Sequence, residues 1–270
     1  MSPNSLDRIL ASALPIAKHA GELAIDWFKR RDALLITSKG HQDWVSQADQ
    51  EVECYLRQAL LNAFPQHQFL GEENGGRYQP PCWVVDPIDG TTNFLYGQAD
   101  FVVSLAFADG QGPALGIIVA PALQRLLYAV RGKGAFEIVD GKAKALKPRA
   151  AAKEQLVVGL NLNYQSGIPQ QYMAHSQALI NAGHQVRVNG SAAWGLTQVA
   201  TGELDACYMG EVNVWDAMAA QIICQEAKLS TAPHLIEQLH GPVWAWPKDA
   251  AISDLLSIDN HKEQAHQSVK

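Results

Sequence analysis

The sequence of 270 residues has little cysteine and no excess of basic charge. Its cysteines form neither a C-x-x-C pair nor a zinc-like pattern with histidine, which disfavours a disulfide framework and a zinc site. We expect reduced and mostly buried thiols at Cys54, Cys82, Cys207 and Cys224. The net charge of −6 and the isoelectric point near 5.8 disfavour a general nucleic-acid or membrane binder, and we expect neither partner.

Several familiar sequence signals are also missing. No apolar run is long enough to span a bilayer. The first residues lack a basic region followed by an apolar stretch, so we expect no secretion signal and a cytoplasmic protein. The motifs G-x-x-x-x-G-K-[ST], G-x-G-x-x-G, G-x-S-x-G and H-E-x-x-H are absent, which disfavours the nucleotide-binding, serine-hydrolase and zinc-protease chemistries that they serve. The nine histidines are scattered, and we expect none to be catalytic.

The most informative stretch that is present is WVVDPIDGTTNF, residues 83–94. The apolar run Cys82–Val85 predicts a buried strand, which places Asp86 at its carboxyl end, where Pro87 stops regular pairing. Asp89 follows on the same tight turn. Two carboxylates so close repel each other and cannot both stay ionised without a cation. A hard divalent metal with oxygen ligands resolves that conflict.

The same motif continues into a predicted anion site. Gly90 and Thr91 lie at an expected helix start, where free backbone N–H groups favour an anion. A metal ion beside an anion site predicts hydrolysis of a phosphate ester. The alternative is an ordinary turn with two solvated aspartates, since Asp-Gly is common in turns. The length of the motif and its matching pieces elsewhere in the chain favour the metal site.

Three more acidic residues fit this prediction. Asp49 lies at the opening of the second helix, Glu72 directly follows a strand and a glycine, and Asp216 heads an otherwise apolar helix. Taken singly, each has a simpler explanation, as a helix cap, a solvated loop acid or a first-turn charge. Their joint occurrence with Asp86 and Asp89 favours a metal centre.

Hydrophobic periodicity predicts layered α and β structure without internal repeats. In the first half we expect helices over 6–28, interrupted by Pro15, and from 46–49 to Pro65, short strands over 34–37 and 68–70, and an antiparallel meander over 102–108, 115–120, 126–130 and 135–139. After a basic connection at 142–153, we expect strands over 156–160, 185–188, 206–209 and 243–246, helices over 170–181, 191–200, 215–227 and 250–256, and a frayed tail at 261–270. Residues 1–145 would form a half with most metal ligands, and residues 146–270 a half with Asp216 and the substrate wall.

In combination, these motifs resemble the inositol monophosphatase family, within the lithium-sensitive, magnesium-dependent phosphatase superfamily. The carrying motifs are Gly71-Glu72-Glu73, Trp83 to Phe94, Arg131 to Phe136, Arg187 to Ala193 and Trp215-Asp216-Ala217, and their order and spacing match across residues 6–258. The resemblance implies an α+β fold, a layered α-β-α-β-α sandwich of the inositol monophosphatase and fructose-1,6-bisphosphatase type. It also implies Mg²⁺-dependent hydrolysis of a small phosphorylated metabolite by a homodimer.

The resemblance further assigns roles to single residues. Glu72, Asp86 and the carbonyl of Ile88 would hold one Mg²⁺, and Asp86, Asp89 and Asp216 a second, with a third, weaker ion near Glu72. Gly90 and Thr91 amides would orient the phosphate. Glu72, Asp49 and the Thr91 hydroxyl would act on the attacking water. The substrate contacts would be Gly190, Ser191, Ala192, Met209 and Glu211.

The sequence departs from the family pattern on the substrate side. Relatives that act on inositol phosphates carry a hydroxyl-reading glutamate seven residues before the second-half aspartate, where this chain has Met209, and Glu211 is out of that register. Lys228-Leu229 stands where Gly-Gly is usual, and the Lys39 loop is one residue shorter. The substrate could therefore be an inositol or similar polyol phosphate, a 3′(2′),5′-bisphosphate nucleotide, or a sugar or histidinol phosphate. A role as a regulatory partner of the transcription machinery is the alternative of another class.

Overall fold

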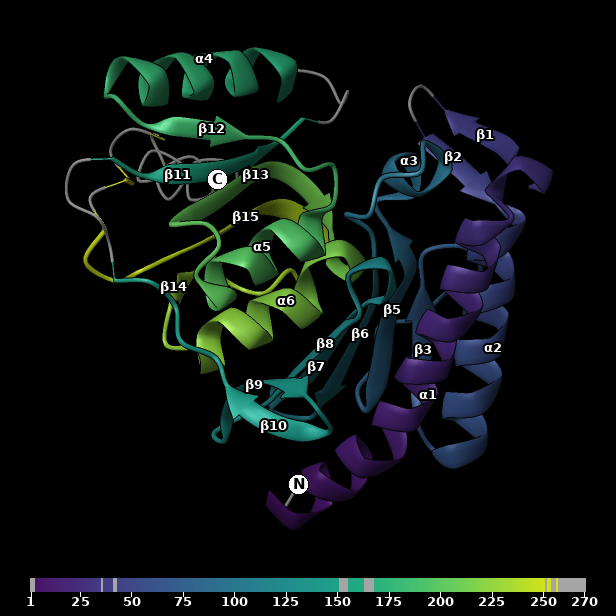
Figure 1. The fold of residues 1–270 in the computed structure, drawn as a ribbon. Coiled ribbons are helices and arrows are strands. Elements are labelled where there is room, and N and C mark those ends of the chain that lie inside the picture. Colours follow the sequence, from purple (N-terminus) through teal and green to yellow (C-terminus); the bar gives the residue numbers. More distant parts are fainter. Residues whose placement is uncertain are drawn as a thin grey trace, which may run out of the picture.

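Layers of helix and sheet alternate through the molecule (Figure 1). The computed structural model describes residues 3–34, 36–40, 43–150, 155–162, 168–250, 252–253 and 256. Within them the α-helices are α1 (Pro3–Lys29), α2 (Gln47–Ala63), α3 (Thr91–Leu95), α4 (Ile168–Asn181), α5 (Ala192–Thr201) and α6 (Val214–Glu226). The short helices η1 (Arg31–Ala33) and η2 (Pro121–Leu123) are of the 3₁₀ type.

Most strands belong to two large sheets. The first contains β3 (Gln68–Gly71), β4 (Gly75–Gly76), β5 (Cys82–Asp89), β6 (Val102–Asp109), β7 (Gly112–Ala120), β8 (Arg125–Val130), β9 (Gly134–Val139) and β10 (Lys142–Ala145). The second contains β11 (Val157–Asn161), β12 (Gln185–Arg187), β13 (Ala206–Asn213), β14 (Ser230–Thr231) and β15 (His240–Trp246). A separate hairpin pairs β1 (Ile36–Gly40) with β2 (Asp43–Ser46).

The helices form three layers around these sheets. Helices α1 and α2 cover the outer face of the first sheet, α5 and α6 lie between the sheets, and α4 covers the outer face of the second (Figure 1). Apolar side chains fill each interface, which is where amphipathic helices and two-sided sheets must meet. This is the α-β-α-β-α sandwich that the family resemblance implies.

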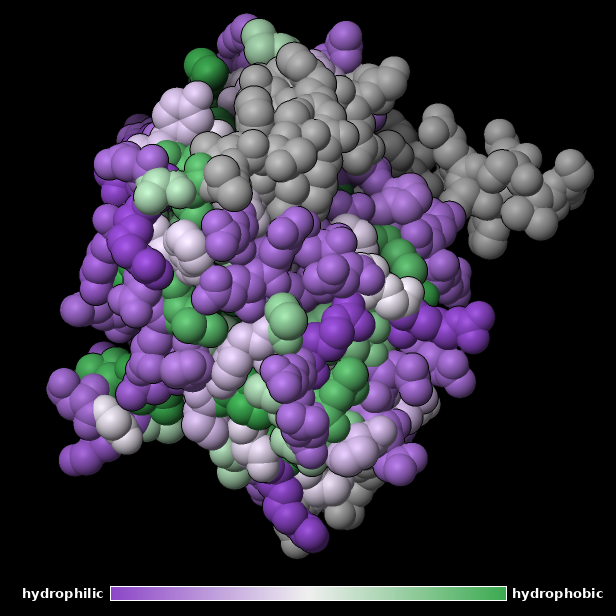
Figure 2. All heavy atoms as spheres, turned by 90° about the vertical axis from the view of Figure 1, so that its right-hand side faces the viewer, coloured by the Kyte–Doolittle hydropathy of each residue, from purple (hydrophilic) through white to green (hydrophobic). Residues whose placement is uncertain are grey.

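The outer layer shows the polar side of this arrangement. Over α1 and α2, hydrophilic side chains predominate and hydrophobic ones are scattered (Figure 2). Helix α1 continues through Pro15, where the sequence predicts an interruption. Pro15 lies on the exposed side, so the carbonyl that it leaves without a partner can bond water, while Ala13 and Ala17 pack in the core. Among the described residues, no helix combines the length and the apolar character that a membrane span requires.

The pairing of β3 with β5 brings distant sequence positions together. The two strands are parallel, with Gly71 opposite Val85. Glu72 and Asp86 directly follow this pair, so parallel register alone places them side by side at the carboxyl edge of the first sheet. Beyond β5, the sheet continues as the predicted antiparallel meander from β6 to β9.

Helix α6 connects the two sheets. It starts directly after β13, and its first turn carries Asp216. At its other end, the Glu226 carboxylate accepts hydrogen bonds from the backbone N–H groups of Gly132 (2.9 Å) and Gly134 (2.8 Å), in the turn between β8 and β9. Both glycines have positive φ, +77° and +95°, which this turn requires. The helix is therefore anchored to the second sheet at its start and to the first sheet at its end.

Several elements differ from the sequence predictions. Strand β5 does not end at Asp86 but runs to Asp89, and its register against β6 shifts between Asp86 and Asp89, around Pro87. The segment predicted as a connection begins with strand β10, and β1 starts two residues later than expected. The predicted strand over 206–209 extends to Asn213. The predicted helix over 250–256 and the tail over 261–270 lie largely outside the described residues, as do His41 and Gln42 of the Lys39 loop.

Candidate metal centre

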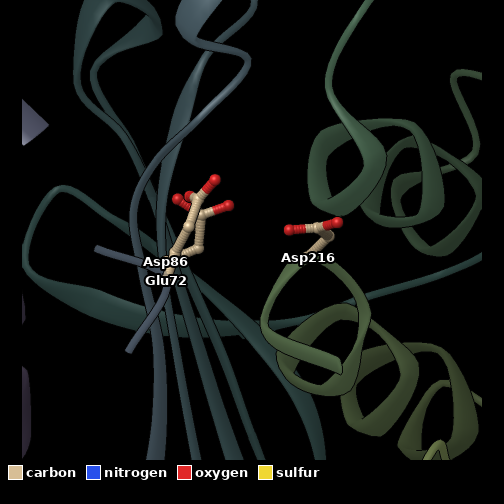
Figure 3. Close-up of side chains that lie close together, drawn as sticks. All are labelled: Glu72, Asp86 and Asp216. Carbon is tan, nitrogen blue, oxygen red and sulfur yellow. The ribbon is translucent and has the colours of Figure 1, made fainter. Parts of the chain in front are cut away.

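Three carboxylates from separate parts of the chain meet at the edge of the first sheet. Glu72 follows β3, Asp86 lies in β5, and Asp216 lies in the first turn of α6. Each offers one carboxylate oxygen, and these oxygens lie within 4.8 Å of one another. Figure 3 shows the Glu72 and Asp86 side chains next to each other, with Asp216 facing them from the start of α6. The structure thus brings together three of the five predicted metal ligands, and the other two, Ile88 and Asp89, are not part of this group.

Burial and repulsion disfavour the ionised forms of Asp86 and Asp216. Asp86 is only 2% exposed, and its pKa lies well above the usual value because of burial and of repulsion from Glu72, Asp89 and Asp216. Burial, followed by repulsion from Asp89, raises the pKa of Asp216 to about 7. The fold therefore places acidic side chains where their ionised forms repel one another.

The donor set fits a hard divalent cation. Carboxylate and carbonyl oxygens are the ligands that Mg²⁺ and Ca²⁺ prefer, whereas soft metals favour thiolate and imidazole. Glu72, Asp86 and Asp216 supply carboxylate oxygens alone, and the carbonyl of Ile88 lies in the same turn of β5. A divalent ion placed among them would offset the burial and the repulsion that raise the pKa of Asp86.

Asp89 points toward helix α5. Its Oδ1 accepts a hydrogen bond from Ala192 N (3.1 Å), and its Oδ2 accepts from Ala193 N (2.6 Å) and from the Ser191 hydroxyl. Burial raises the pKa of Asp89 to about 6, and these hydrogen bonds oppose the rise. Asp89 is not among the three residues grouped above, but it contributes repulsion to both Asp86 and Asp216. Its negative charge is held at the N-terminus of α5, where a helix favours an anion.

Asp49 and Thr91 form a hydrogen-bonded pair next to this cluster. Asp49 is the third residue of α2 and caps that helix, because its Oδ2 accepts from Ser46 N (2.8 Å) and Ser46 Oγ (2.6 Å). Its Oδ1 lies 3.3 Å from the Thr91 hydroxyl, which also lies 3.0 Å from the Ile88 carbonyl. The single hydroxyl proton can serve only one of these acceptors at a time. Asp49 is fully buried, and burial raises its pKa.

The turn that carries Thr91 depends on Gly90. This residue adopts φ +93°, and a Cβ there would come 2.9 Å from the Asp100 carbonyl oxygen and 3.1 Å from Ser191 Cβ. Only glycine satisfies both the backbone angle and the close approach. Helix α3 starts directly afterwards, and the first N–H groups of a helix have no partner inside it.

Comparison with known proteins shows the family of this chain. The model of the Inositol monophosphatase family matches residues 5–228. The chain belongs to this family. It is 31% identical over 231 residues to "Inositol monophosphatase" of Dictyostelium discoideum, covering 83% of this chain and 84% of that one. It is 30% identical over 225 residues to "Nus factor SuhB" of Haemophilus influenzae, covering 82% and 84%.

Solved structures of the family share the fold. The extragenic suppressor protein suhB of Bartonella henselae superposes with a TM-score of 0.82 at 26% identity, covering 93% of this chain and 97% of that one. The inositol monophosphatase TM1415 of Thermotoga maritima has a TM-score of 0.78 at 24% identity, covering 96% and 99%, and shows the fold alone. Membership of the inositol monophosphatase family makes this chain a phosphoric monoester hydrolase.

The residues that the family resemblance assigns to the substrate lie in two environments. Gly190, Ser191 and Ala192 form the entry to α5, and Ser191 caps that helix by accepting from Trp194 N (3.1 Å). Gly190 also lines a cavity of about 620 Å³, together with Asn93, Asp100 and Arg187.

Met209 and Glu211 lie on β13 but differ in their surroundings. Met209 is 1% exposed and packs beneath α5, where a Cβ added to Gly195 would come 2.9 Å from its Cε. Glu211 lies 2.6 Å from Nδ1 of His240 on the neighbouring strand β15. The pairing of β13 with β15 shifts register between Met209 and Val212. Spacing along the sequence therefore does not fix how Met209 and Glu211 correspond to the glutamate of the family pattern.

Two residues of this site escaped the sequence analysis. Ser46 fixes Asp49 through a capping box, and its spacing of three residues from an acidic side chain was the available signal. Asn93 donates from Nδ2 to the Asp100 carbonyl (2.7 Å) and to the Asn189 carbonyl, which ties α3 to the loop before α5. No local pattern indicates that second contact, because it joins residues 96 positions apart.

Proposed function

We propose that this chain hydrolyses a small phosphate monoester in a reaction that depends on Mg²⁺. The observation that carries the proposal is the convergence of Glu72, Asp86 and Asp216, which lie far apart in the sequence, to within 4.8 Å of one another. Asp86 is buried and Glu72 and Asp216 are partly buried, and burying like charges without a cation is costly. The hydrogen-bonded pair of Asp49 and Thr91 beside them supplies a group that can act on water.

Two or three Mg²⁺ ions would bind at this centre. We propose Glu72, Asp86 and the Ile88 carbonyl as ligands of one ion and Asp86, Asp89 and Asp216 as ligands of a second, with Asp86 shared. Bound cations would supply the positive charge that makes a water molecule more acidic and stabilises the charge of the phosphoryl transition state. In this assignment residues 1–145 contribute all ligands except Asp216, which comes from residues 146–270.

The remaining groups of the site would orient the reactants. When Thr91 donates its hydroxyl proton to Asp49, its oxygen lone pairs are free to accept a hydrogen bond from a water molecule. Asp49 has a raised pKa and can take up the proton that this water releases. The backbone N–H groups of Gly90 and Thr91 would hold the phosphate oxygens. Because α3 has only five residues, this contact would depend on individual N–H groups.

For the substrate, we propose inositol monophosphate or a similar polyol phosphate. The names of the relatives in Dictyostelium discoideum and Rhizobium meliloti support this class. Met209 in place of a hydroxyl-reading glutamate predicts weak discrimination, because a site lacking one polar partner loses selectivity. A 3′(2′),5′-bisphosphate nucleotide and a sugar or histidinol phosphate are the competing substrates.

A substrate panel with a metal-ligand variant tests the proposal. Phosphate release would be measured with Mg²⁺ from inositol 1-phosphate, adenosine 3′,5′-bisphosphate, fructose 1,6-bisphosphate and histidinol phosphate. Asp86→Asn should lower kcat by a factor of about 10³ or more, as expected for loss of transition-state charge stabilisation. Asparagine keeps the Oδ1 acceptor that bonds Ile88 N (2.9 Å), so the turn is preserved. Full activity of Asp86→Asn, or of the wild type in excess chelator, would refute the mechanism.

Asp89 is a less suitable position than Asp86 for such a test variant. The sequence alone recommends Asp89→Asn because it removes charge without changing volume. In the structure, however, both Asp89 oxygens accept hydrogen bonds at the start of α5, and an asparagine NH₂ group would face a backbone N–H there. We still expect Asp89→Asn to abolish turnover, but part of that loss would come from the disturbed helix start.

A second candidate function is regulatory binding to the transcription machinery. The observation that favours it is the name "Nus factor SuhB" carried by relatives in Haemophilus influenzae and Pasteurella multocida. A pull-down of cell lysate with Asp86→Asn as bait separates the two functions. Recovery of transcription components by this variant would support binding that is independent of catalysis, whereas their absence with both variant and wild type would argue against it.

A further inference from the structure

A fully buried acid on α2 contacts the loop that carries Glu72. Glu53 is 0% exposed, like its neighbours Val52 and Leu56 on the same helix, which are apolar core residues. A buried carboxylate without partners is costly, so the hydrogen bonds of Glu53 are needed to stabilise it. They all lead to the first sheet or to Arg57 on the same helix.

The Glu53 carboxylate accepts hydrogen bonds from the segment immediately after Glu72. Oε2 accepts from Glu73 N (2.7 Å), and Oε1 accepts from Asn74 N (3.0 Å) and Asn74 Nδ2 (3.0 Å). On the other side of Glu72, the carboxylate lies against Gly71, where an added Cβ would come 2.7 Å from Oε1. Glu53 therefore fixes the backbone on both sides of Glu72.

Arg57 completes this arrangement. Its Nη2 lies 3.3 Å from Glu53 Oε1 and 2.8 Å from the Gly75 carbonyl, at the end of the same turn. Its guanidinium also stacks over the Phe69 ring, 4.2 Å from the ring centroid, in the strand that precedes the turn. The positive charge of Arg57 compensates Glu53 and joins α2 to both strands that flank Glu72.

We infer that Glu53 is a positioning residue that holds the Glu72 carboxylate at the cation centre. Glu72 is only partly buried and repels Asp86, so a loosely held turn would let it move toward solvent. The three hydrogen bonds that Glu53 accepts from Glu73 and Asn74 oppose that movement before any cation arrives. Groups that orient metal ligands typically contribute 10–100-fold to metal affinity. This inference rests on the proposed function only in taking Glu72 as a cation ligand.

The test measures cation binding directly, without substrate. Glu53→Gln keeps the side-chain volume but replaces one of the two acceptor oxygens with an NH₂ group, which must then face the backbone N–H of Glu73 or of Asn74. Titration calorimetry with Mn²⁺ should show at least about tenfold weaker binding than in wild type, and the Mg²⁺ concentration for half-maximal activity should rise in parallel. At saturating Mg²⁺, kcat should return to within a few-fold of wild type.

Asp109→Asn is the matched control. Asp109 is also buried, and its carboxylate likewise bonds a backbone N–H, that of Gln111 (2.8 Å), and an arginine, Arg131 (2.7 Å). Asp109 lies at the end of β6 that is remote from the acidic cluster, because Ala108 pairs with Cys82 at the start of β5 and Val102 pairs with Asp89 at its end. Asp109→Asn should lower thermal stability without changing Mn²⁺ affinity.

Three outcomes would overturn the inference. They are unchanged Mn²⁺ affinity in Glu53→Gln, an equal loss of affinity in Asp109→Asn, or a loss of kcat in Glu53→Gln that saturating Mg²⁺ does not restore. If Glu53→Gln fails to fold, Asn74→Ala decides, because it removes one hydrogen bond to Glu53 from an exposed position. That variant should weaken Mn²⁺ binding by a smaller factor, and unchanged affinity would refute the role. A wild type that binds Mn²⁺ but hydrolyses no phosphate ester would refute the proposed function and leave this inference standing.

Discussion

Several acidic side chains of the site lie at the N-terminal ends of helices. Asp49 is the third residue of α2, Asp216 is the third residue of α6, and Asp89 accepts N–H groups at the start of α5. Each helix start offers backbone donors and a partial positive charge to a carboxylate that must otherwise be buried against its neighbours. Single residues thus serve two purposes, since the hydrogen bonds that orient these carboxylates also satisfy backbone N–H groups at the helix starts.

The Thr91 hydroxyl can be tested apart from the carboxylates. Thr91→Val removes the hydroxyl but keeps the branched shape, so we expect kcat to fall by about 100-fold or more with little change in thermal stability. Thr91→Ser keeps the hydroxyl and should retain most activity. Steady-state kinetics of both variants on one substrate would decide. Equal activities would mean that Thr91 contributes only its backbone N–H.

Lithium inhibition is expected from the second proposed cation position. Asp89 repels both Asp86 and Asp216, and at the second position proposed for these three acids a small monovalent ion could take the place of Mg²⁺. A titration with LiCl at high Mg²⁺ should lower the rate, with KCl as the control for ionic strength. Identical curves for the two salts would count against the assignment of this second position.

At the scale of elements, the position of α6 depends on a close approach to the first sheet. A Cβ added to Gly116 in β7 would overlap the carbonyl of Ala219 in the middle of α6. Gly116→Ala should therefore lower the free energy of unfolding by about 1–3 kcal/mol and shift Asp216 away from Asp86, with loss of activity.

Gly110→Ala is the control for this prediction. Gly110 lies in the turn between β6 and β7, and a Cβ there meets no atom within 4 Å. Its effect on stability should stay within about 0.5 kcal/mol, as for most surface substitutions. Thermal unfolding followed by circular dichroism measures both variants. Comparable losses in the two would mean that the contact between Gly116 and α6 does not decide the position of the helix.

The elements themselves were largely predictable, and their ends were not. The meander from β6 to β9 was confirmed because alternating apolar residues and Gly or Pro turns are local signals. The extension of β5 past Pro87 was missed, because a bulge is decided by the partner strand and not by the proline. Strand β10 was missed because all of its residues are exposed, so Lys142 and Lys144 give no hydrophobic pattern.

At the scale of the whole molecule, the site exists only where two sheets are brought together. The joint occurrence of Glu72, Asp86 and Asp216 in the sequence predicted a metal centre, and the family resemblance assigned them to particular ions. Their meeting depends on parallel pairing of β3 with β5 and on α6 crossing to the first sheet. The Glu53 contacts and the link from Asn93 to Asn189 join segments remote in sequence, and no local pattern indicates them.

The carboxylate cluster should make global stability depend on pH and on cations. The pKa of Asp216 is raised to about 7 and that of Asp89 to about 6, above the ordinary value of 3.8. Between pH 6.5 and 8, the folded cation-free protein therefore holds protons that the unfolded chain has released. Stability should fall as pH rises through this window. Below pH 6.5 the trend is offset, because burial lowers the pKa of His234 to about 4.

Differential scanning calorimetry with chelator, at pH 6.5 and pH 8, would measure this effect. The melting temperature should be lower at pH 8, and Mg²⁺ should raise it most at that pH, because a cation binds the ionised cluster of the folded state. Asp216→Asn should reduce both the pH dependence and the stabilisation by Mg²⁺. The same pH slope in this variant would assign the effect to groups outside the cluster.

The fixed ends of α6 also limit how the length of this chain can change. Asp216 lies in its first turn and Glu226 is its last residue, and each end is tied to a different sheet. Each residue inserted or deleted between them would rotate one end relative to the other by about 100°. Either the carboxylate would leave the cluster or Glu226 would leave its turn. Family members that conserve this site should therefore vary in length at the exposed turn 140–141, and keep the spacing from 216 to 226 constant.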